Sequence, residues 1–111
     1  MIASDDIIKK AVQFIREKIS PDKIYLFGSY AKGSPTENSD LDFFIIKDSN
    51  LPRPKRAAPL YSIGKSKSLG VPIGVDFIVY TPKEYAESKK ELNSIASEVT
   101  RTGKLLYERT S

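Results

Sequence analysis

The sequence predicts an α/β (α+β) fold, a mixed sheet of three to four strands with helices packed on it. Three short apolar segments, at residues 24–27, 41–46 and 75–80, have the length and composition of buried strands. A segment with helical apolar spacing precedes them. The chain of 111 residues is expected to form a single domain, 1–111, because that length supports one hydrophobic core.

The first element is predicted to be an amphipathic helix over residues 5–19. Its apolar residues recur every three or four positions and form one stripe: Ile7, Ile8, Ala11, Val12, Ile15 and Ile19. Ser4 is a suitable N-cap, and Pro21 follows the expected end. We expect this helix to pack against the sheet.

The first strand, 24–27, ends at Gly28, after which residues 29–32 are expected to begin a brief helix and 33–38 to form a polar loop. In the second strand, 41–46, side chains alternate between two faces. Leu41, Phe43 and Ile45 share one face, and Phe44 and Ile46 share the other. Since both faces are apolar, this strand is expected to be central.

The remaining elements follow from turn and capping signals. Residues 48–56 are expected to be a loop, 57–69 a helix, and 75–80 the third strand. Thr81-Pro82-Lys83-Glu84 is a capping box that predicts a helix start. A further helix is predicted near 92–101, ending before Gly103, and residues 105–107 are predicted to add a short strand.

Three aspartates constrain the strand directions. Asp40 and Asp42 open the second strand, and Asp76 opens the third. For the acids to meet the turn at Gly28, the first two strands must be antiparallel. For Asp76 to join them, the second and third strands must be parallel, and the roughly 30 residues between their starts allow a helical crossover.

The acidic residues predict a metal site. Asp40 and Asp42 are spaced i, i+2, which in a strand puts both on one face, roughly 6–7 Å apart. At about 5 Å and an effective dielectric near 20, two such charges repel by about 3 kcal/mol. A divalent cation relieves that repulsion. The sequence has no cysteine and no histidine, so the ligands must be oxygens, which favour Mg²⁺ or Mn²⁺ and exclude thiolate and imidazole chemistry.

Charge and hydropathy limit the classes of molecule that the protein is expected to bind. The net charge is +4, and basic residues crowd the middle of the chain: Arg53, Lys55, Arg56, Lys65 and Lys67. They indicate either a footprint for a triphosphate or nucleic acid, or a solvated surface. Aromatic residues do not alternate with them, so direct nucleic-acid binding is not expected. The longest apolar run, 43–46, is too short for a membrane span, and a cytoplasmic location is expected.

The stretch Gly28-Ser29-Tyr30-Ala31-Lys32-Gly33, followed by Ser39-Asp40-Leu41-Asp42, resembles the signature of the DNA polymerase β nucleotidyltransferase superfamily. The short chain and the late Asp76 resemble its minimal nucleotidyltransferases (MNT), and the similarity covers roughly residues 5–108. The resemblance implies the nucleotidyltransferase fold.

The resemblance also implies roles for the nucleotide-binding residues. The backbone amides at Gly28 and Ser29, with the Ser29 hydroxyl, would hold the β and γ phosphates at a helix N-terminus. Gly33 would let the backbone pass close to the nucleotide, and Lys32 would add positive charge beside the triphosphate. No chemistry is assigned to Tyr30.

In the same family pattern, Asp40 and Asp42 would bind two Mg²⁺ ions, with Asp76 on the second ion and helping to take the proton from the attacking hydroxyl. ATP would be the substrate. Minimal nucleotidyltransferases of this length often act with a HEPN-type helical toxin. The resemblance therefore implies an antitoxin that transfers AMP to a hydroxyl group of that partner, on a tyrosine.

Two alternatives stay open on sequence grounds. One is a nucleotidyltransferase for a small molecule such as an aminoglycoside, working with a second chain. The other is a non-catalytic nucleotide-binding antitoxin module that neutralises its partner by contact. The presence of all three acids, Asp40, Asp42 and Asp76, argues against the non-catalytic alternative.

Overall fold

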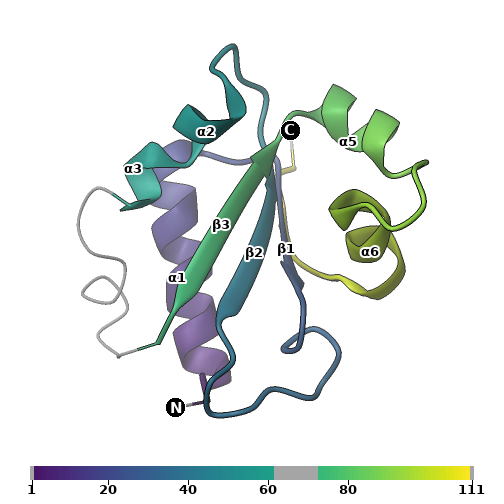
Figure 1. The fold of residues 1–111 in the computed structure, drawn as a ribbon. Helices are drawn as coiled ribbons and strands as arrows, with labels where there is room; N and C mark the ends of the chain where they lie inside the picture. The colour runs from purple at the N-terminus through teal and green to yellow at the C-terminus, as the bar shows by residue number, and fades with distance from the viewer. Residues whose placement is uncertain (1, 62–72, 111) are drawn as a thin grey trace.

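The computed structural model describes residues 2–61 and 73–110 and shows a sheet flanked by helices (Figure 1). In chain order its elements are α1 (Asp5–Ile19), β1 (Lys23–Phe27), β2 (Leu41–Ile46), α2 (Arg53–Arg56), α3 (Ala58–Tyr61), β3 (Val75–Tyr80), α5 (Pro82–Ser88), α6 (Ile95–Thr102) and β4 (Lys104–Glu108). Of the helices in these residues, none combines the length and the apolar character that crossing a bilayer requires.

The four strands form one mixed sheet in the order β3-β2-β1-β4. β2 pairs antiparallel with β1 and parallel with β3, and β4 pairs antiparallel with β1. Both predicted strand directions are therefore confirmed. α2 and α3 lie in the crossover between the parallel strands, where sequence length allowed a helical connection.

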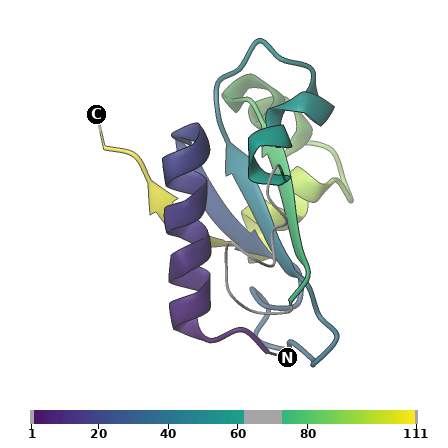
Figure 2. The same ribbon diagram turned by 90° about the vertical axis from the view of Figure 1, so that its left-hand side faces the viewer.

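The sheet is covered on both faces, so the domain has three layers (Figures 1 and 2). Leu41, Phe43 and Ile45 of β2 belong to the cluster that contains the buried side of α1. Phe44 and Ile46 belong to a second cluster on the other face, under α6. The predicted division of β2 by parity is confirmed, and β2 is the most completely buried strand because both its faces carry core residues.

The helix starts follow their local capping signals. The Ser4 side chain accepts a hydrogen bond from the Ile7 amide at 3.3 Å, which begins α1 at the predicted residue. At α5, Thr81 and Glu84 form the reciprocal capping box: Glu84 N–H donates to the Thr81 hydroxyl, and Thr81 N–H donates to the Glu84 carboxylate.

Several local predictions were wrong. Residues 29–32 form an irregular turn in place of a helix. The predicted loop 48–56 contains the short helix α2, with proline in its first turn. The helix predicted from residue 92 begins only at Ile95, because Ser94 caps it by accepting the Ser97 amide. The helix predicted over 57–69 begins as α3, and its part beyond residue 61 lies outside the described residues.

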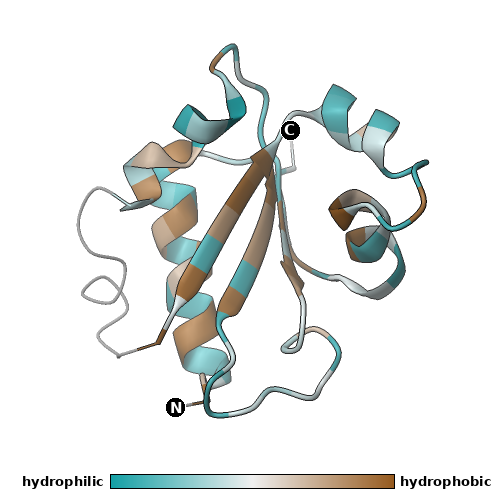
Figure 3. Ribbon diagram, in the orientation of Figure 1, coloured by the Kyte–Doolittle hydropathy of each residue, from teal (hydrophilic) through white to brown (hydrophobic). Residues whose placement is uncertain are grey.

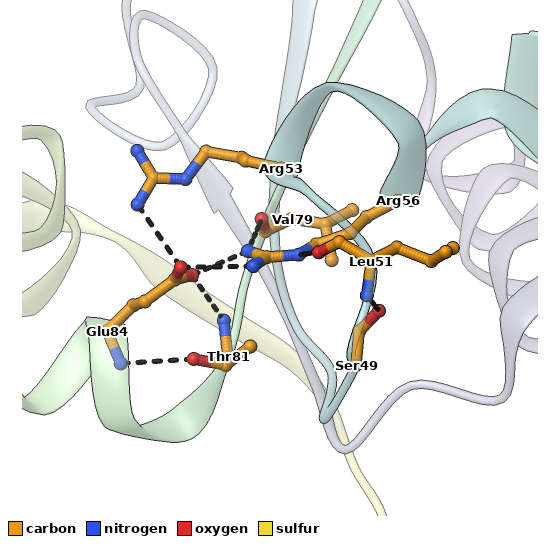
Figure 4. Close-up of polar contacts among 7 residues, drawn as sticks. All are labelled: Ser49, Leu51, Arg53, Arg56, Val79, Thr81 and Glu84. Carbon is orange, nitrogen blue, oxygen red and sulfur yellow. Dashed lines mark hydrogen bonds and ion pairs between the residues drawn. The ribbon is translucent and has the colours of Figure 1, made fainter.

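An arginine–glutamate cluster ties the crossover to the end of the sheet (Figure 4). Arg56, whose side chain is only 8% exposed, donates to both oxygens of Glu84 at 2.5 and 3.0 Å. It also donates to the main-chain carbonyls of Leu51 and Val79. The hydrogen bonds that Glu84 accepts, first those from Arg56 and then that from the Thr81 amide, lower the pKa of Glu84 to about 2. α2 is therefore fastened to β3 and α5 together.

The outer edge of β3 is covered by side chains from the same crossover. The Phe77 amide donates to the Tyr61 hydroxyl at 2.9 Å, and Arg56 occupies the Val79 carbonyl at 3.3 Å. An exposed strand edge is a template for unwanted pairing. Here side chains of α2 and α3 occupy two of its main-chain groups.

Replacing Phe43 by alanine tests the packing of the central strand. Phe43 is fully buried, and its ring stacks on Phe77 with centroids 5.9 Å apart. Phe43→Ala should lower the free energy of unfolding by about 3–5 kcal/mol through cavity formation, measured by denaturant titration. Leu105→Ala, at a leucine that is 47% exposed, should lower it by less than about 1 kcal/mol. Equal losses in the two variants would contradict the assignment of Phe43 to the core.

Candidate nucleotidyltransferase site

The parallel register of β2 and β3 places Asp42 directly beside Asp76. In-register neighbours on adjacent strands point to the same face, and the strands lie about 4.8 Å apart. Each aspartate is the second residue of its strand, and Figure 3 shows a hydrophilic band near the start of both strands. Two carboxylates that are 34 positions apart in sequence therefore lie at one end of the sheet, beside β1, where Phe27 pairs with Asp42.

Gly28 lies against the Asp42 carboxylate. Its φ of +76° is in the left-handed region, which favours glycine. A Cβ at this position would also come within 2.6 Å of Oδ2 of Asp42. Two independent constraints thus require glycine here, and the turn after β1 is held close to an acid of β2.

Gly74 has the corresponding relation to Asp40, which sequence analysis did not foresee. A Cβ on Gly74 would overlap Oδ1 of Asp40. The Gly74 carbonyl accepts a hydrogen bond from the Leu41 amide at 2.8 Å, which joins the starts of β2 and β3. The available signal in the sequence is the glycine directly before the third strand.

Asp42 has an unfavourable electrostatic environment. Its pKa is raised to about 6, first by burial and then by the charges of Asp76, Asp40 and Glu98. Each of these causes disfavours the ionised form. The three predicted aspartates therefore lie close enough for Asp42 to experience the other two, together with a fourth acid that the sequence analysis did not include.

That fourth acid, Glu98, is contributed by α6. Its Oε1 lies 3.2 Å from the Nζ of Lys32, which belongs to the turn after β1. Lys32 was predicted to contact the triphosphate, and in the structure its ammonium group is paired with Glu98. The pair joins residues 66 positions apart, so local sequence patterns gave no sign of it.

The turn between Gly28 and Gly33 is held by main-chain hydrogen bonds. The Lys32 amide donates to the Gly28 carbonyl at 3.2 Å, and the Ser34 amide donates to the Ser29 carbonyl at 3.0 Å. Gly33 also has a φ of +76°, but a Cβ there would meet no atom within 4 Å. Ser29 is partly exposed. Any phosphate site here is thus built on a turn, and the predicted helix N-terminus is absent from this described segment.

Tyr30 anchors this turn to the start of the chain. Its side chain is buried, and its hydroxyl accepts a hydrogen bond from the Ala3 amide at 2.8 Å. Tyr30, to which no chemistry is assigned, therefore connects the turn to the segment before α1.

The donor set suits a hard divalent cation. The site offers carboxylate oxygens from Asp40, Asp42 and Asp76, which are the ligands that Mg²⁺ prefers. Within residues 2–61 and 73–110, acidic side chains do not form a ready-made cage of three ligands. Burial and the charges of Asp76, Asp40 and Glu98 raise the pKa of Asp42, and a bound cation would stabilise its ionised form.

Comparison with known families assigns the chain. Residues 8–101 match the model of the nucleotidyltransferase domain. The chain belongs to this family. The match includes the turn at Gly28, all three aspartates and Glu98.

Individual relatives share shorter segments. The Methanocaldococcus jannaschii protein named "Putative protein adenylyltransferase MJ1379" is 40% identical over 45 residues, which are 40% of this chain and 45% of that protein. The CCA-adding enzyme of Thermoplasma acidophilum is 41% identical over 51 residues, which are 46% of this chain and 23% of that enzyme. The chain thus spans less than half the length of these curated relatives.

Solved structures share the fold. A toxin–antitoxin crystallised with AMP-PNP superposes with a TM-score of 0.63 at 23% identity, over 91% of this chain and 73% of that one. A "putative nucleotidyltransferase" from Sulfolobus solfataricus has a TM-score of 0.55 at 18% identity, over 98% of this chain and 93% of that one. The mixed sheet with its two helical layers is therefore the nucleotidyltransferase fold.

A matched pair of glycine substitutions tests the contact between the turn and Asp42. Gly28→Ala and Gly33→Ala introduce the same methyl group at the same φ of +76°, which costs about 1–2 kcal/mol in backbone strain in each. Only Gly28→Ala also pushes on the Asp42 carboxylate. We expect it to be less stable than Gly33→Ala in thermal denaturation. Equal melting temperatures would contradict the close approach of Gly28 to Asp42.

The raised pKa of Asp42 predicts a pH-dependent stability difference. Between the ordinary pKa of 3.8 and about 6, the folded state binds more protons than the unfolded state, so stability falls as pH rises through this window. Asp42→Asn removes the effect. In metal-free buffer it should melt above wild type at pH 7.5, and the gap should narrow as pH falls from 6 towards 4. A gap that is constant with pH would contradict the assignment.

Proposed function

We propose that this chain is a Mg²⁺-dependent protein adenylyltransferase that transfers AMP from ATP to a hydroxyl group of a toxin partner, and so acts as an antitoxin. The observation that carries the proposal is the in-register pair Asp42 and Asp76 beside the turn at Gly28. For the finer assignment we propose a HEPN-type helical toxin as partner and a tyrosine as acceptor. Because the donor is ATP, we propose a cytoplasmic location.

The relatives support the class of acceptor. The Methanocaldococcus jannaschii relative carries the name of a protein adenylyltransferase, and a second relative from that organism, 40% identical over 40 residues, carries the same description. Structures that share the fold come from toxin–antitoxin complexes, one of them with an ATP analogue. A protein acceptor is therefore favoured over a small molecule.

In the proposed reaction, the oxygen of the acceptor hydroxyl bonds to the α phosphorus of ATP, and the bond from that phosphorus to the bridging oxygen breaks. Pyrophosphate leaves with that oxygen. Asp76 accepts the hydroxyl proton, which its exposed position at the start of β3 allows. Gly28 and Ser29 hold the triphosphate through main-chain amides, Gly33 lets the chain pass beside it, and Lys32 adds positive charge.

Asp40, Asp42 and Asp76 would hold the two Mg²⁺ ions of this proposal. When bound, such ions neutralise phosphate charge and stabilise the attacking and leaving oxygens. The role of the chain is to present the carboxylates on two adjoining strands. Asp42 is partly buried and would be one of these metal ligands.

Labelled ATP tests the proposal directly. The protein is incubated with ATP labelled on the α phosphate, with Mg²⁺, in the presence and absence of a purified candidate toxin partner. Label on the toxin supports AMP transfer. Pyrophosphate release without labelled protein would replace the proposal with a small acceptor. Nucleotide binding without turnover would replace it with the non-catalytic module.

Aspartate substitutions test the site residues. Asp42→Asn and Asp76→Asn should each lower the rate of AMP transfer by more than about 100-fold, since changes to residues that merely orient metal ligands already cost 10–100-fold. Asp48→Asn, at an exposed aspartate beyond the other end of β2, should transfer AMP at the wild-type rate. Normal transfer by Asp42→Asn with Mg²⁺ would refute the assigned site.

A further inference from the structure

Glu98 forms an ion pair with Lys32, the lysine that is proposed to contact the triphosphate. Its Oε1 lies 3.2 Å from the Nζ of Lys32, in a pair whose side chains are 34% and 48% exposed. Lys32 belongs to the turn proposed to hold the triphosphate. The two side chains come from different elements, α6 and the turn after β1, so the pair joins α6 to the turn that is proposed to hold the triphosphate.

The two partners differ in mobility. α6 is fixed on the sheet because Ala96 and Val99 are fully buried against Phe27 and Phe44. Glu98 projects from this helix on a side chain that is shorter than that of lysine. Lys32 has a longer, exposed side chain on a turn. The ammonium group is therefore the member of the pair that can move to another anion.

Glu98 also lies near the acidic cluster, because its charge is one of the causes that raise the pKa of Asp42. A triphosphate would bring further negative charge to this place. In the absence of nucleotide, Glu98 neutralises Lys32, and with nucleotide it would compete with the phosphates for the same ammonium group.

We propose that Glu98 is a residue that weakens nucleotide binding, because it must release Lys32 before that lysine can contact the triphosphate. The inference rests on the proposed function, since it assumes that ATP binds beside the turn. Exposed ion pairs are worth up to about 1 kcal/mol. Releasing Lys32 should therefore tighten nucleotide binding by up to about fivefold, at tenfold per 1.36 kcal/mol.

Two substitutions of Glu98 separate competition for Lys32 from simple repulsion. Glu98→Gln removes the charge, whereas Glu98→Asp keeps it on a side chain one methylene shorter that withdraws from Lys32. Calorimetric titration with AMP-PNP and Mg²⁺ should give a Kd about two- to fivefold lower than wild type for both variants. Glu91→Gln, at an exposed glutamate in the connection between α5 and α6, should bind like wild type.

A double-mutant cycle completes the test. In a Lys32→Met background, Glu98→Gln and Glu98→Asp should no longer tighten binding. Persistence of the full gain without Lys32, or a gain from Glu98→Gln alone, would overturn competition in favour of direct repulsion. Weaker AMP-PNP binding in both Glu98 variants would also overturn the proposed competition, and would show that Glu98 supports nucleotide binding. If wild type fails to bind AMP-PNP at all, the proposed function fails as well.

Discussion

The parallel pairing of β2 with β3 is the constraint on which this site depends. It puts Asp42 beside Asp76, and the strands can hold this arrangement because their other residues are core residues on both faces of the sheet. Hydrophobic burial along the strands outweighs a repulsion of a few kcal/mol at their ends. The buried strands thus hold the site rigid, and the aspartates near their starts supply its negative charge.

Carboxylates at the two ends of the sheet have pKa values shifted in opposite directions. At the end of β3, Glu84 receives two hydrogen bonds from Arg56, and its pKa is lowered. At the start of β2, Asp42 is partly buried among other acids, and its pKa is raised. The first arrangement stabilises the fold. The second has no structural benefit on its own, which is typical of a site that awaits a cation or a proton.

Local patterns allowed most of the fold to be predicted from the sequence. Ser4 and Thr81 mark helix starts by their own side chains, and the alternation in 41–46 assigns each residue to a face, so these features need no knowledge of distant contacts. The strand directions came from requiring the three acids to meet one another and the turn at Gly28. The short helix at 53–56 was missed because two prolines and mixed charge are equally typical of a loop.

The residues that complete the site could not be found in this way. Gly74 matters because of the carboxylate of Asp40, and Glu98 matters because of Lys32, and both contacts join segments far apart in sequence. Neither a glycine nor a glutamate in the sequence indicates which distant residue it will contact. Only the crossover that returns β3 to β2, and the packing of α6 on the end of β1, bring them into place.

The hydrogen bond from the Ala3 amide to Tyr30 has a practical consequence for handling the protein. Whatever precedes Ala3 emerges next to the glycine turn, whereas the opposite terminus leaves at the other end of the sheet (Figure 1). An affinity tag or fluorescent fusion placed ahead of Ala3 would crowd the glycine turn that is proposed to hold ATP. Attached after β4 instead, the same appendage would leave that turn clear.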